Sequence, residues 1–415
     1  MIETYFSRTP TLTRFRSGPL GTDLDELAKT LHQQGYAQDS IRRYVRGCDH
    51  FGQWLFQHGY AIAEVNQTLV KRYISGLRRS PSGHLPKAAE GLSHLIKLWR
   101  QQERLPGHRE DSPRTEAGLW LLRYQQYLDQ VCGTAASTQS HYLRMARRFL
   151  AACFGPGPVA WRSLQASRIA AFVQHEAATK HGGGRKLPST AVRSFLRFLV
   201  FSGEIAAGLE AAAPTPRQWT HDVIPQRLTS EEVERALAHY SGETATGLRN
   251  RAILMFLSRL GCRAHEVVSL CLEDINWHEG RIVIHSSKTH HQRGLPLSQD
   301  VGCALADYLR WGRPRTTSRV IFLHCRAPFR PFADAAAISR IAARALVRTG
   351  VTGHSRLGAH VFRHTAASEM VNQGASFKEV ADVLGHQSLQ TTGIYAKLDL
   401  VALSEVALPW IGDPQ

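Results

Sequence analysis

Residues 360–364 read His360-Val-Phe-Arg363-His364, and they open a predicted helix over 360–373. Positions i, i+3 and i+4 of a helix lie on one face, so the two imidazoles and the guanidinium should converge. A helix with a purely structural role seldom carries three such groups together, because desolvating them costs free energy. The stretch is therefore the first candidate for a site that carries chemistry.

His360 and His364 could also be interpreted as zinc ligands. Zinc sites in proteins are built from three or four Cys, His, Asp or Glu side chains. No carboxylate or cysteine stands within this stretch, and Arg363 would place a positive charge beside the metal. We therefore expect no metal in this site.

A second candidate stretch, Gly261-Cys-Arg263-Ala-His-Glu266, follows a predicted apolar helix over 249–260. A glycine that ends a helix leaves the next side chains free to project into a cleft. Arg263 is then a candidate site residue. It could equally be a surface residue paired with Glu266.

Two short motifs follow the helix that carries His360. Leu384-Gly385-His386 ends a predicted helix over 376–384, and Thr391-Thr-Gly-Ile-Tyr395 brings a tyrosine nine residues after His386. Each motif is a weak signal by itself, since a tyrosine near a helix most often belongs to a half-buried core.

The segment around these motifs is predicted to be mostly helical with a small antiparallel sheet. Thr229-Ser-Glu-Glu232 is a capping box that starts a helix. Residues 281–285 include the β-branched run Ile282-Val283-Ile284, and a polar loop over 286–292 separates them from 294–297, which indicates a hairpin. Further helices are expected over 300–311 and 334–349.

The order Arg, Lys, His-x-x-Arg, His, Tyr along 227–400 resembles the tyrosine recombinases, also called phage integrases. The six positions that match the catalytic residues of the family are Arg263, Lys288, His360, Arg363, His386 and Tyr395. The resemblance implies a mainly α catalytic domain with a small antiparallel β-sheet, an α+β fold. It also implies that DNA is cleaved and rejoined through a 3′-phosphotyrosyl intermediate on Tyr395, with no metal, ATP or other cofactor.

These residue types suit attack on a phosphodiester. Arg263 and Arg363 present planar forks of donors that match phosphate oxygens and stay protonated. A free tyrosine has a pKa of about 10, so neighbouring cations would help to form its phenolate. Lys288, in the hairpin loop, could protonate the leaving 5′ oxygen. His360 is a candidate general base or phosphate donor, and His386 a phosphate donor.

Two polar, proline-containing stretches, 106–113 and 211–225, divide the chain. We predict a helical, DNA-binding-like module over 1–110, a helical core-binding domain over 115–212, and the catalytic domain over 225–415. The core-binding assignment is what the family resemblance implies for the middle segment.

The first two segments share a spacing that suggests a duplicated helical module. Tyr44 and Tyr142 stand 98 positions apart, and so do Phe51 and Phe149. Small loop insertions would explain the larger offsets of later matches. Chance similarity between two amphipathic helical stretches is the alternative.

Composition favours a polyanionic partner. The 415 residues include 51 Lys and Arg against 34 Asp and Glu, a net charge of +17. Double-stranded DNA is the simplest such partner, and a merely solvated basic surface is the alternative. Seven scattered cysteines and the lack of a long apolar run favour a cytoplasmic, nucleoid-associated protein with no membrane segment.

The most economical interpretation is a site-specific recombinase or integrase that serves integration or transposition of a mobile element. The family resemblance implies a tetramer on two recombination sites, which accessory or sister recombinases could join. Three alternatives stay open: a topoisomerase or resolvase with a related site, a DNA-binding accessory protein with an inactive site, and an RNA-binding helical protein. The full set of six residues argues against the second, and missing RNA-binding motifs argue against the third.

Overall fold

A computed structural model of the chain describes residues 1–78, 88–105, 115–179, 182–215, 226–240, 242–285, 292–354, 357–386 and 392–398. Two compact units result, one of residues 106–222 and one of residues 1–105 with 223–415. Buried apolar side chains form separate clusters within 2–105, 120–213 and 228–395. The domain boundaries given above stay a prediction, because separate clusters do not show which segments fold alone.

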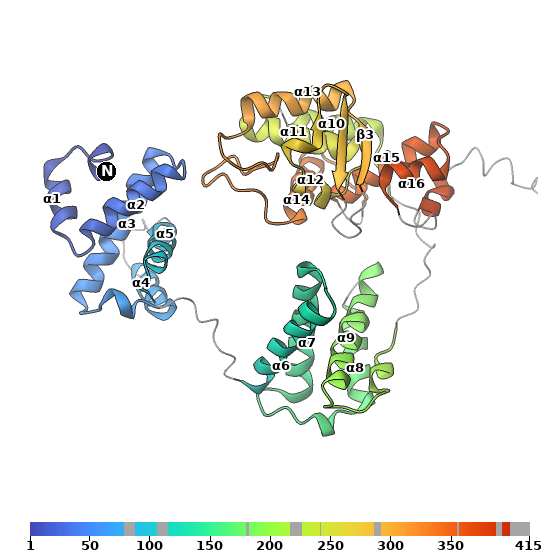
Figure 1. Cartoon of the computed structure of the whole chain (residues 1–415), viewed down its shortest axis with the longest axis horizontal. Coiled ribbons are helices and arrows are strands. Elements are labelled where there is room, and N and C mark those ends of the chain that lie inside the picture. The colour runs from blue at the N-terminus through green and yellow to red at the C-terminus, as the bar shows by residue number, and fades with distance from the viewer. Residues whose placement is uncertain are drawn as a thin grey trace, which may run out of the picture. The chain divides into compact units, whose positions relative to one another are not determined.

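The described part of the first 105 residues is mostly helical (Figure 1). The long helix α3 is amphipathic, and it buries Phe51 against Tyr73 of α4 at 4.8 Å between ring centroids. Trp99 of α5 is fully buried in the same cluster. The elements are η1 (Ile2–Thr4), α1 (Thr9–Ser17), α2 (Gly21–Gln33), α3 (Gln38–Gln57), η2 (Ile62–Glu64), α4 (Gln67–Arg78) and α5 (Ala88–Gln101).

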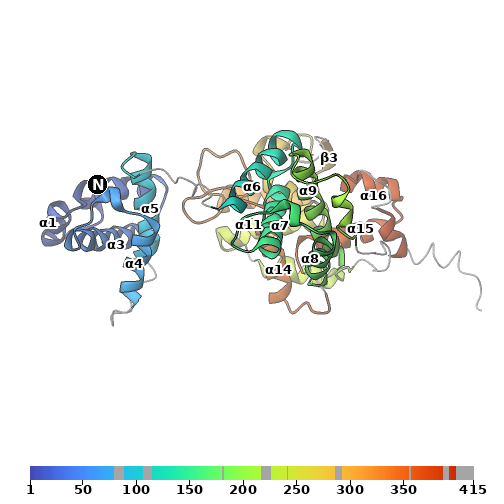
Figure 2. The same ribbon diagram turned by 90° about the horizontal axis from the view of Figure 1, so that it is seen from below.

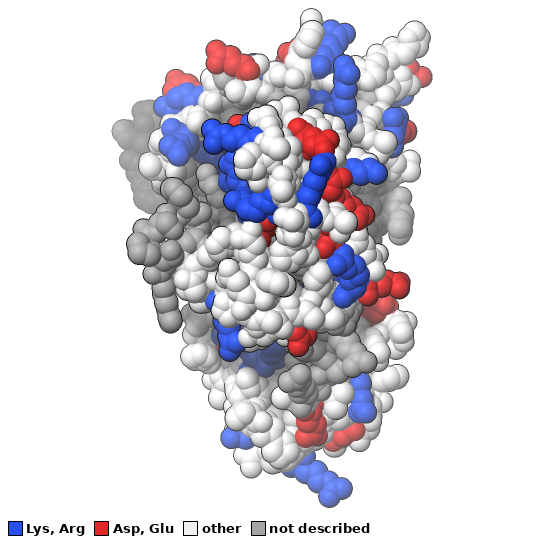
Figure 3. Space-filling model, turned by 90° about the vertical axis from the view of Figure 1, so that its left-hand side faces the viewer, with Lys and Arg blue, Asp and Glu red and all other residues white. Residues whose placement is uncertain are grey.

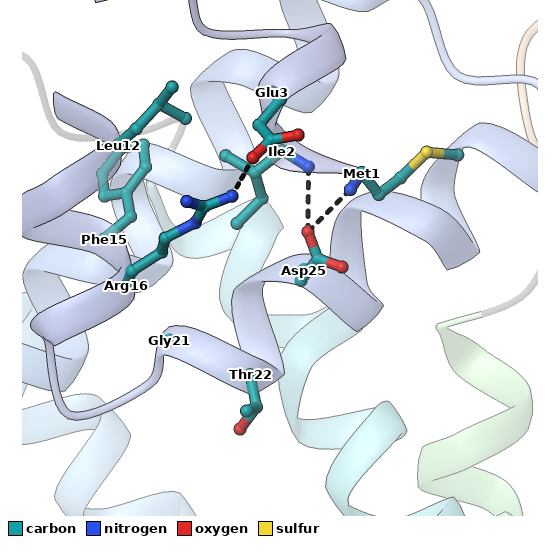
Figure 4. Close-up of a pocket in the computed structure, with 9 residues that line it drawn as sticks. All are labelled: Met1, Ile2, Glu3, Leu12, Phe15, Arg16, Gly21, Thr22 and Asp25. Atoms are coloured by element: carbon teal, nitrogen blue, oxygen red, sulfur yellow. Dashed lines mark hydrogen bonds and ion pairs between the residues drawn. The ribbon is translucent and has the colours of Figure 1, made fainter. Parts of the chain in front are cut away.

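A cavity of about 340 Å³ lies between η1, α1 and α2 (Figure 4). Asp25 lines the cavity and fixes the position of the first residues. Its carboxylate accepts hydrogen bonds from the Met1 amino group at 3.0 Å and from the Ile2 backbone N–H at 2.9 Å. Arg16 pairs with Glu3 across the opening. These ion pairs fix the local packing, and none of the sequence-predicted site residues lines the cavity.

The middle segment is an aromatic-rich helical bundle. Phe195 is fully buried, and its ring lies 5.0 Å from that of Tyr124, whose hydroxyl donates to the Ser194 hydroxyl at 2.9 Å. The elements are α6 (Glu116–Gln126), η3 (Tyr127–Val131), α7 (Ala136–Phe154), η4 (Trp161–Ser163), α8 (Ala166–Ala178), η5 (Gly182–Lys186), α9 (Leu187–Phe201) and η6 (Leu209–Ala212).

The predicted repeat places related residues on corresponding helices of these two segments. Phe51 of α3 and Phe149 of α7 are both fully buried, and Tyr73 of α4 and Phe172 of α8 are buried as well. Equivalent burial agrees with duplication, and also with two unrelated amphipathic bundles. Common origin therefore stays a prediction.

The last segment is mostly helical with one small sheet, as predicted. Its capping box forms, since Thr229 accepts from the Glu232 backbone N–H and the Glu232 carboxylate accepts from that of Thr229. The elements are α10 (Ser230–His239), α11 (Ala245–Ser258), α12 (Ala264–Ser269), η7 (Leu272–Asp274), β1 (Ile275–Asn276), β2 (Arg281–His285), β3 (Gln292–Pro296), α13 (Gln299–Asp307), η8 (Tyr308–Gly312), α14 (Ala335–Arg348), α15 (Ala359–Asn372), α16 (Phe377–Leu384) and η9 (Gly393–Leu398).

The sheet has the order β1-β2-β3 and is antiparallel throughout. Arg281 pairs with Pro296 and His285 with Gln292, so the predicted hairpin is present and its second strand begins at Gln292. The short strand β1 is an addition that sequence patterning missed, because two residues carry no periodicity. Ile282, Ile284 and Leu295 are buried and anchor the hairpin on the helical core.

Helices α15 and α16 lie side by side (Figures 1 and 2), which brings together the segments that carry the candidate residues. Among the described residues, no helix combines the length and the apolar character that a bilayer crossing needs.

Phe195→Ala should destabilise the middle bundle by about 3–5 kcal/mol, the usual cost of deleting a buried phenyl ring. Phe201→Ala on the same helix should cost far less, because Phe201 is 68% exposed. Denaturant unfolding followed by tryptophan fluorescence compares the two variants. Equal midpoints for both would show that the ring of Phe195 does not support the bundle.

Candidate active site

Helix α15 presents the three groups that its sequence predicted on one face. Arg363 is buried, and it donates from Nη1 to the Gly261 carbonyl at 2.6 Å and from Nη2 to the Leu384 carbonyl at 2.8 Å. The His360 and His364 rings lie 6.4 Å apart between centroids, with His360 exposed. The helix therefore carries a buried guanidinium together with one exposed and one partly buried imidazole.

Arg263 stands at the N-cap of α12, directly after the chain leaves α11. Gly261 makes this turn with a φ of +59°, and a Cβ there would lie 2.7 Å from Leu384 Cδ2. The Arg263 guanidinium donates to the Gly385 carbonyl at 3.0 Å and to Glu266 Oε1 at 3.1 Å. Arg263 thus pairs with Glu266 and also contacts the segment that ends α16, and its catalytic role stays a prediction.

Glu266 is fully buried and binds a second arginine that the sequence analysis did not single out. Arg293 of β3 donates from Nη1 and Nη2 to the two carboxylate oxygens, each at 2.8 Å, and from Nε to the Val383 carbonyl at 2.8 Å. The Arg293 and Arg263 guanidiniums hold the pKa of Glu266 at about 2, against the opposing effect of burial. The carboxylate is therefore ionised at every physiological pH.

His386 lies just after α16. Gly385 ends this helix in the left-handed region at φ +64°, as predicted for a C-terminal cap. His386 Nδ1 is 2.8 Å from Thr392 Oγ1, which ties the histidine to the segment that leads to Tyr395. Burial, and after it the charges of Arg363 and Arg263, lower the pKa of His386 to about 4.

Tyr395 of η9 is buried, with 1% of its surface exposed. Its hydroxyl lies 2.8 Å from His364 Nδ1, and it packs with Val371, Val380 and Leu384. Burial raises the pKa of Tyr395 to about 12, although Arg363 and Arg263 act in the opposite direction. The phenol is therefore protonated at neutral pH and needs a proton acceptor before it can act as a nucleophile.

Five of the six predicted site residues come together in this way: Arg263, His360, Arg363, His386 and Tyr395. The segments that carry them are the turn after α11, helix α15, the end of α16 and η9. Lys288, the sixth, lies outside the described residues. In this site the charges of two guanidiniums, those of Arg363 and Arg263, act on the phenol of Tyr395.

His364 and Arg293 belong to the site as well, and the sequence analysis assigned neither a catalytic role. A signal for His364 was present, because it stands one helical turn after His360 on the same face. Arg293 had no such signal, since a basic residue in a short amphipathic strand is most often solvated.

The arrangement suits stabilisation of an anionic transition state. Each guanidinium carries five N–H donors, and the two carbonyl bonds of Arg363 use only part of that set. Burial and the Arg263 charge lower the pKa of Arg363 to about 10, so it stays cationic at neutral pH. No cluster of three or more potential metal ligands occurs within the described part of the chain.

The model of the phage integrase family matches residues 226–400. A putative integrase/recombinase, y4rA of Sinorhizobium fredii (strain NBRC 101917 / NGR234), is 36% identical over 97% of this chain and 98% of its own. The chain belongs to the phage integrase family. Tyrosine recombinase XerD of Mycobacterium tuberculosis (strain CDC 1551 / Oshkosh) is 31% identical over 70% of this chain and 96% of its own.

The fold agrees with this assignment. The solved structure of a lambda integrase tetramer bound to a Holliday junction aligns with a TM-score of 0.52 at 17% identity, covering 74% of this chain and 86% of that one. The predicted fold class is confirmed, and the chain is an enzyme of the tyrosine recombinase type.

Glu266→Gln should destabilise the recombinase domain by about 3–5 kcal/mol, because it removes the charge of a fully buried carboxylate and leaves the partly buried guanidiniums of Arg293 and Arg263 without a counter-charge. The lowered carboxylate pKa stabilises the native state fully above the ordinary value of 4.5, and this contribution is lost as the pH falls towards about 2. The variant should lack that part of the acid dependence. Unfolding free energies measured from pH 6 to pH 2 test both expectations.

Glu279→Gln is the matched control, since Glu279 is exposed in the turn between β1 and β2. It should unfold like the wild type at each pH. Wild-type stability and acid dependence in Glu266→Gln would contradict the role assigned to this carboxylate.

Proposed function

We propose that this chain is a site-specific recombinase that cleaves and rejoins double-stranded DNA through a 3′-phosphotyrosyl intermediate on Tyr395. We propose that this reaction serves the integration or transposition of a mobile element. The observation that carries it is the position of the Tyr395 hydroxyl, 2.8 Å from His364 on the helix that also carries Arg363. The putative integrase/recombinase y4rA, which is similar over nearly the whole chain, supports the mobile-element role.

In the proposed reaction the Tyr395 oxygen attacks a DNA phosphorus and the 5′ oxygen leaves. Charge builds up on the nonbridging oxygens, and the N–H donors of Arg263 and Arg363 stabilise it. His360 and His386 donate further hydrogen bonds to the phosphate. Lys288 protonates the leaving oxygen, in the role that the family resemblance gives it.

Rejoining reverses these steps with a second 5′-hydroxyl as the attacking group. The phosphotyrosyl bond replaces one phosphodiester with another ester of similar energy, so the proposed cycle consumes no ATP. The proposal likewise assigns the transition-state charge to arginine side chains and needs no cofactor.

The proposed DNA surface includes the exposed side of α7. Arg144, Arg147 and Arg148 are exposed there, while Met145 and Phe149 on the other side are buried. Arg148 is partly neutralised by Glu176, which leaves Arg144 and Arg147 as the better phosphate contacts. Figure 3 shows basic side chains gathered on part of the face that it draws, with acidic ones beside them, so net charge alone does not locate the DNA.

We propose a tetramer on two recombination sites as the active assembly, with the module over 1–110 binding DNA or organising partners. The lambda integrase structure is a tetramer bound to a Holliday junction, which supports this arrangement by analogy of fold. Sister recombinases or accessory proteins would join the same assembly. An enzyme acting on chromosomal sites would work in the cytoplasm, at the nucleoid.

Tyr395→Phe should abolish the covalent protein–DNA complex while leaving folding and DNA binding intact, because it removes one oxygen and little volume. Nicked suicide duplexes made from the DNA that flanks the coding gene are the substrate. Peptide mapping of the trapped adduct should find Tyr395 on a 3′ phosphate. An adduct on another residue, a 5′ linkage, or supercoil relaxation without strand exchange would contradict the proposal.

Arg144→Ala/Arg147→Ala should weaken DNA binding on every sequence alike, because phosphate contacts carry no base information. The slope of log binding constant against log salt should fall in magnitude by about 0.9 for each lost contact. Ser140→Ala, on the same exposed side of α7, is the control and should bind like the wild type. An unchanged salt slope in the double variant would place the DNA elsewhere.

A further inference from the structure

The Tyr395 hydroxyl is in contact with a histidine outside the six residues predicted from the sequence. His364 Nδ1 lies 2.8 Å from the phenolic oxygen, and the two rings are 5.7 Å apart between centroids. Helix α15 packs against η9, so both partners are held by backbone that belongs to the domain core. His364 therefore contacts the phenolic oxygen of Tyr395, which is the nucleophilic atom in the proposed reaction.

The other two imidazoles of the site are placed differently. His386 directs Nδ1 to Thr392 Oγ1 at 2.8 Å, and His360 is exposed at the start of α15. Within the described residues, the hydrogen bond of the Tyr395 hydroxyl is with His364. Geometry therefore favours His364 over His360 as the partner of the phenolic proton.

His364 is also in the protonation state that such a role requires. Burial, and after it the charges of His360 and Arg363, lower the pKa of His364 to about 4. The imidazole is then neutral at physiological pH, and the tautomer with its hydrogen on Nε2 offers a free lone pair at Nδ1. A neutral imidazole beside a protonated phenol is a competent acid–base pair.

We propose that His364 positions the Tyr395 hydroxyl and receives its proton as the phenolic oxygen attacks the DNA phosphorus. The inference rests on the proposed function and adds a catalytic residue to it. The phenolic O–H bond breaks as its proton moves to Nδ1, the oxygen–phosphorus bond forms, and the phosphorus–5′-oxygen bond breaks. The leaving oxygen takes its proton from a separate group, and the imidazolium returns its own when the phosphotyrosyl bond is resolved.

This role has a distinctive pH dependence. The titratable groups that act on His364 in the described structure are His360 and Arg363 of α15, His386 after α16, and Tyr395 of η9. The pKa values of His364 and His386 lie at about 4, that of Arg363 at about 10 and that of Tyr395 at about 12, while that of His360 is lowered. None of these pKa values lies between pH 7 and 9, so the rate of wild-type cleavage should be nearly flat there.

His364→Ala removes the acceptor of the phenolic proton. Cleavage then depends on the small fraction of Tyr395 that is already ionised to the phenolate. Single-turnover cleavage of the suicide duplex should fall by about 100-fold or more at pH 7, the usual contribution of a general base. The remaining rate should rise about tenfold per pH unit between pH 7 and 9, because the phenolate fraction does so below the phenol pKa. DNA binding should be unchanged.

His364→Asn separates positioning from proton transfer. Its Oδ1 lies near the place of Nδ1 and can accept the phenolic hydrogen bond, but an amide is not basic at these pH values. This variant should recover part of the loss while keeping the steep pH dependence of His364→Ala. His278→Ala, an exposed histidine of the same domain, is the control and should keep the wild-type rate and the flat profile.

The results separate a failure of the acid–base role of His364 from a failure of the proposed function. A wild-type rate in His364→Ala, or a flat profile at wild-type rate in His364→Asn, would overturn the acid–base role. The absence of any Tyr395 adduct in the wild type would instead overturn the proposed function itself. A circular dichroism spectrum and DNA affinity equal to the wild type show that a slow variant is folded.

Discussion

The buried carboxylate of Glu266 is the interaction on which the site depends. It accepts both Nη donors of Arg293 and also pairs with Arg263, while Arg293 reaches the Val383 carbonyl. One ionised group thereby joins α12, strand β3 and the end of α16. The depression of its pKa from 4.5 to about 2 corresponds to roughly 3 kcal/mol of favourable interaction.

The orientation of Arg263 and Arg363 then follows from how two helices end. The last carbonyls of a helix have no partner within the helix and carry a partial negative charge. Leu384 and Gly385, at the end of α16, offer such carbonyls to Arg363 and Arg263, and the Gly261 carbonyl beyond α11 accepts a second bond from Arg363. Glycine at 261 and 385 allows these turns, since both adopt positive φ. The same turns place His386 and, through Thr392, the segment that carries Tyr395.

The electrostatics of the site divide its groups by function. Arg363 stays charged because even its lowered pKa, about 10, lies well above neutral pH. His364 and His386 are neutral there because burial and the neighbouring arginine charges oppose a further positive charge. Neutral imidazoles suit proton transfer, and permanent cations suit stabilisation of the phosphate. Tyr395, the proposed nucleophile, is buried and protonated beside groups of both kinds.

The sequence by itself determined the mainly helical fold with its hairpin, the capped helix at 229–239, and five of the residues that the structure brings together. It could do so because helical periodicity, β-branching and glycine caps are local, and because the order of Arg263, His360, Arg363, His386 and Tyr395 is specific. Only the tertiary structure decided that His364 contacts Tyr395 and that Arg293 shares Glu266 with Arg263. Those pairings join residues 31 and 27 positions apart, and no local pattern predicts which distant side chains meet, because long-range packing sets their distance.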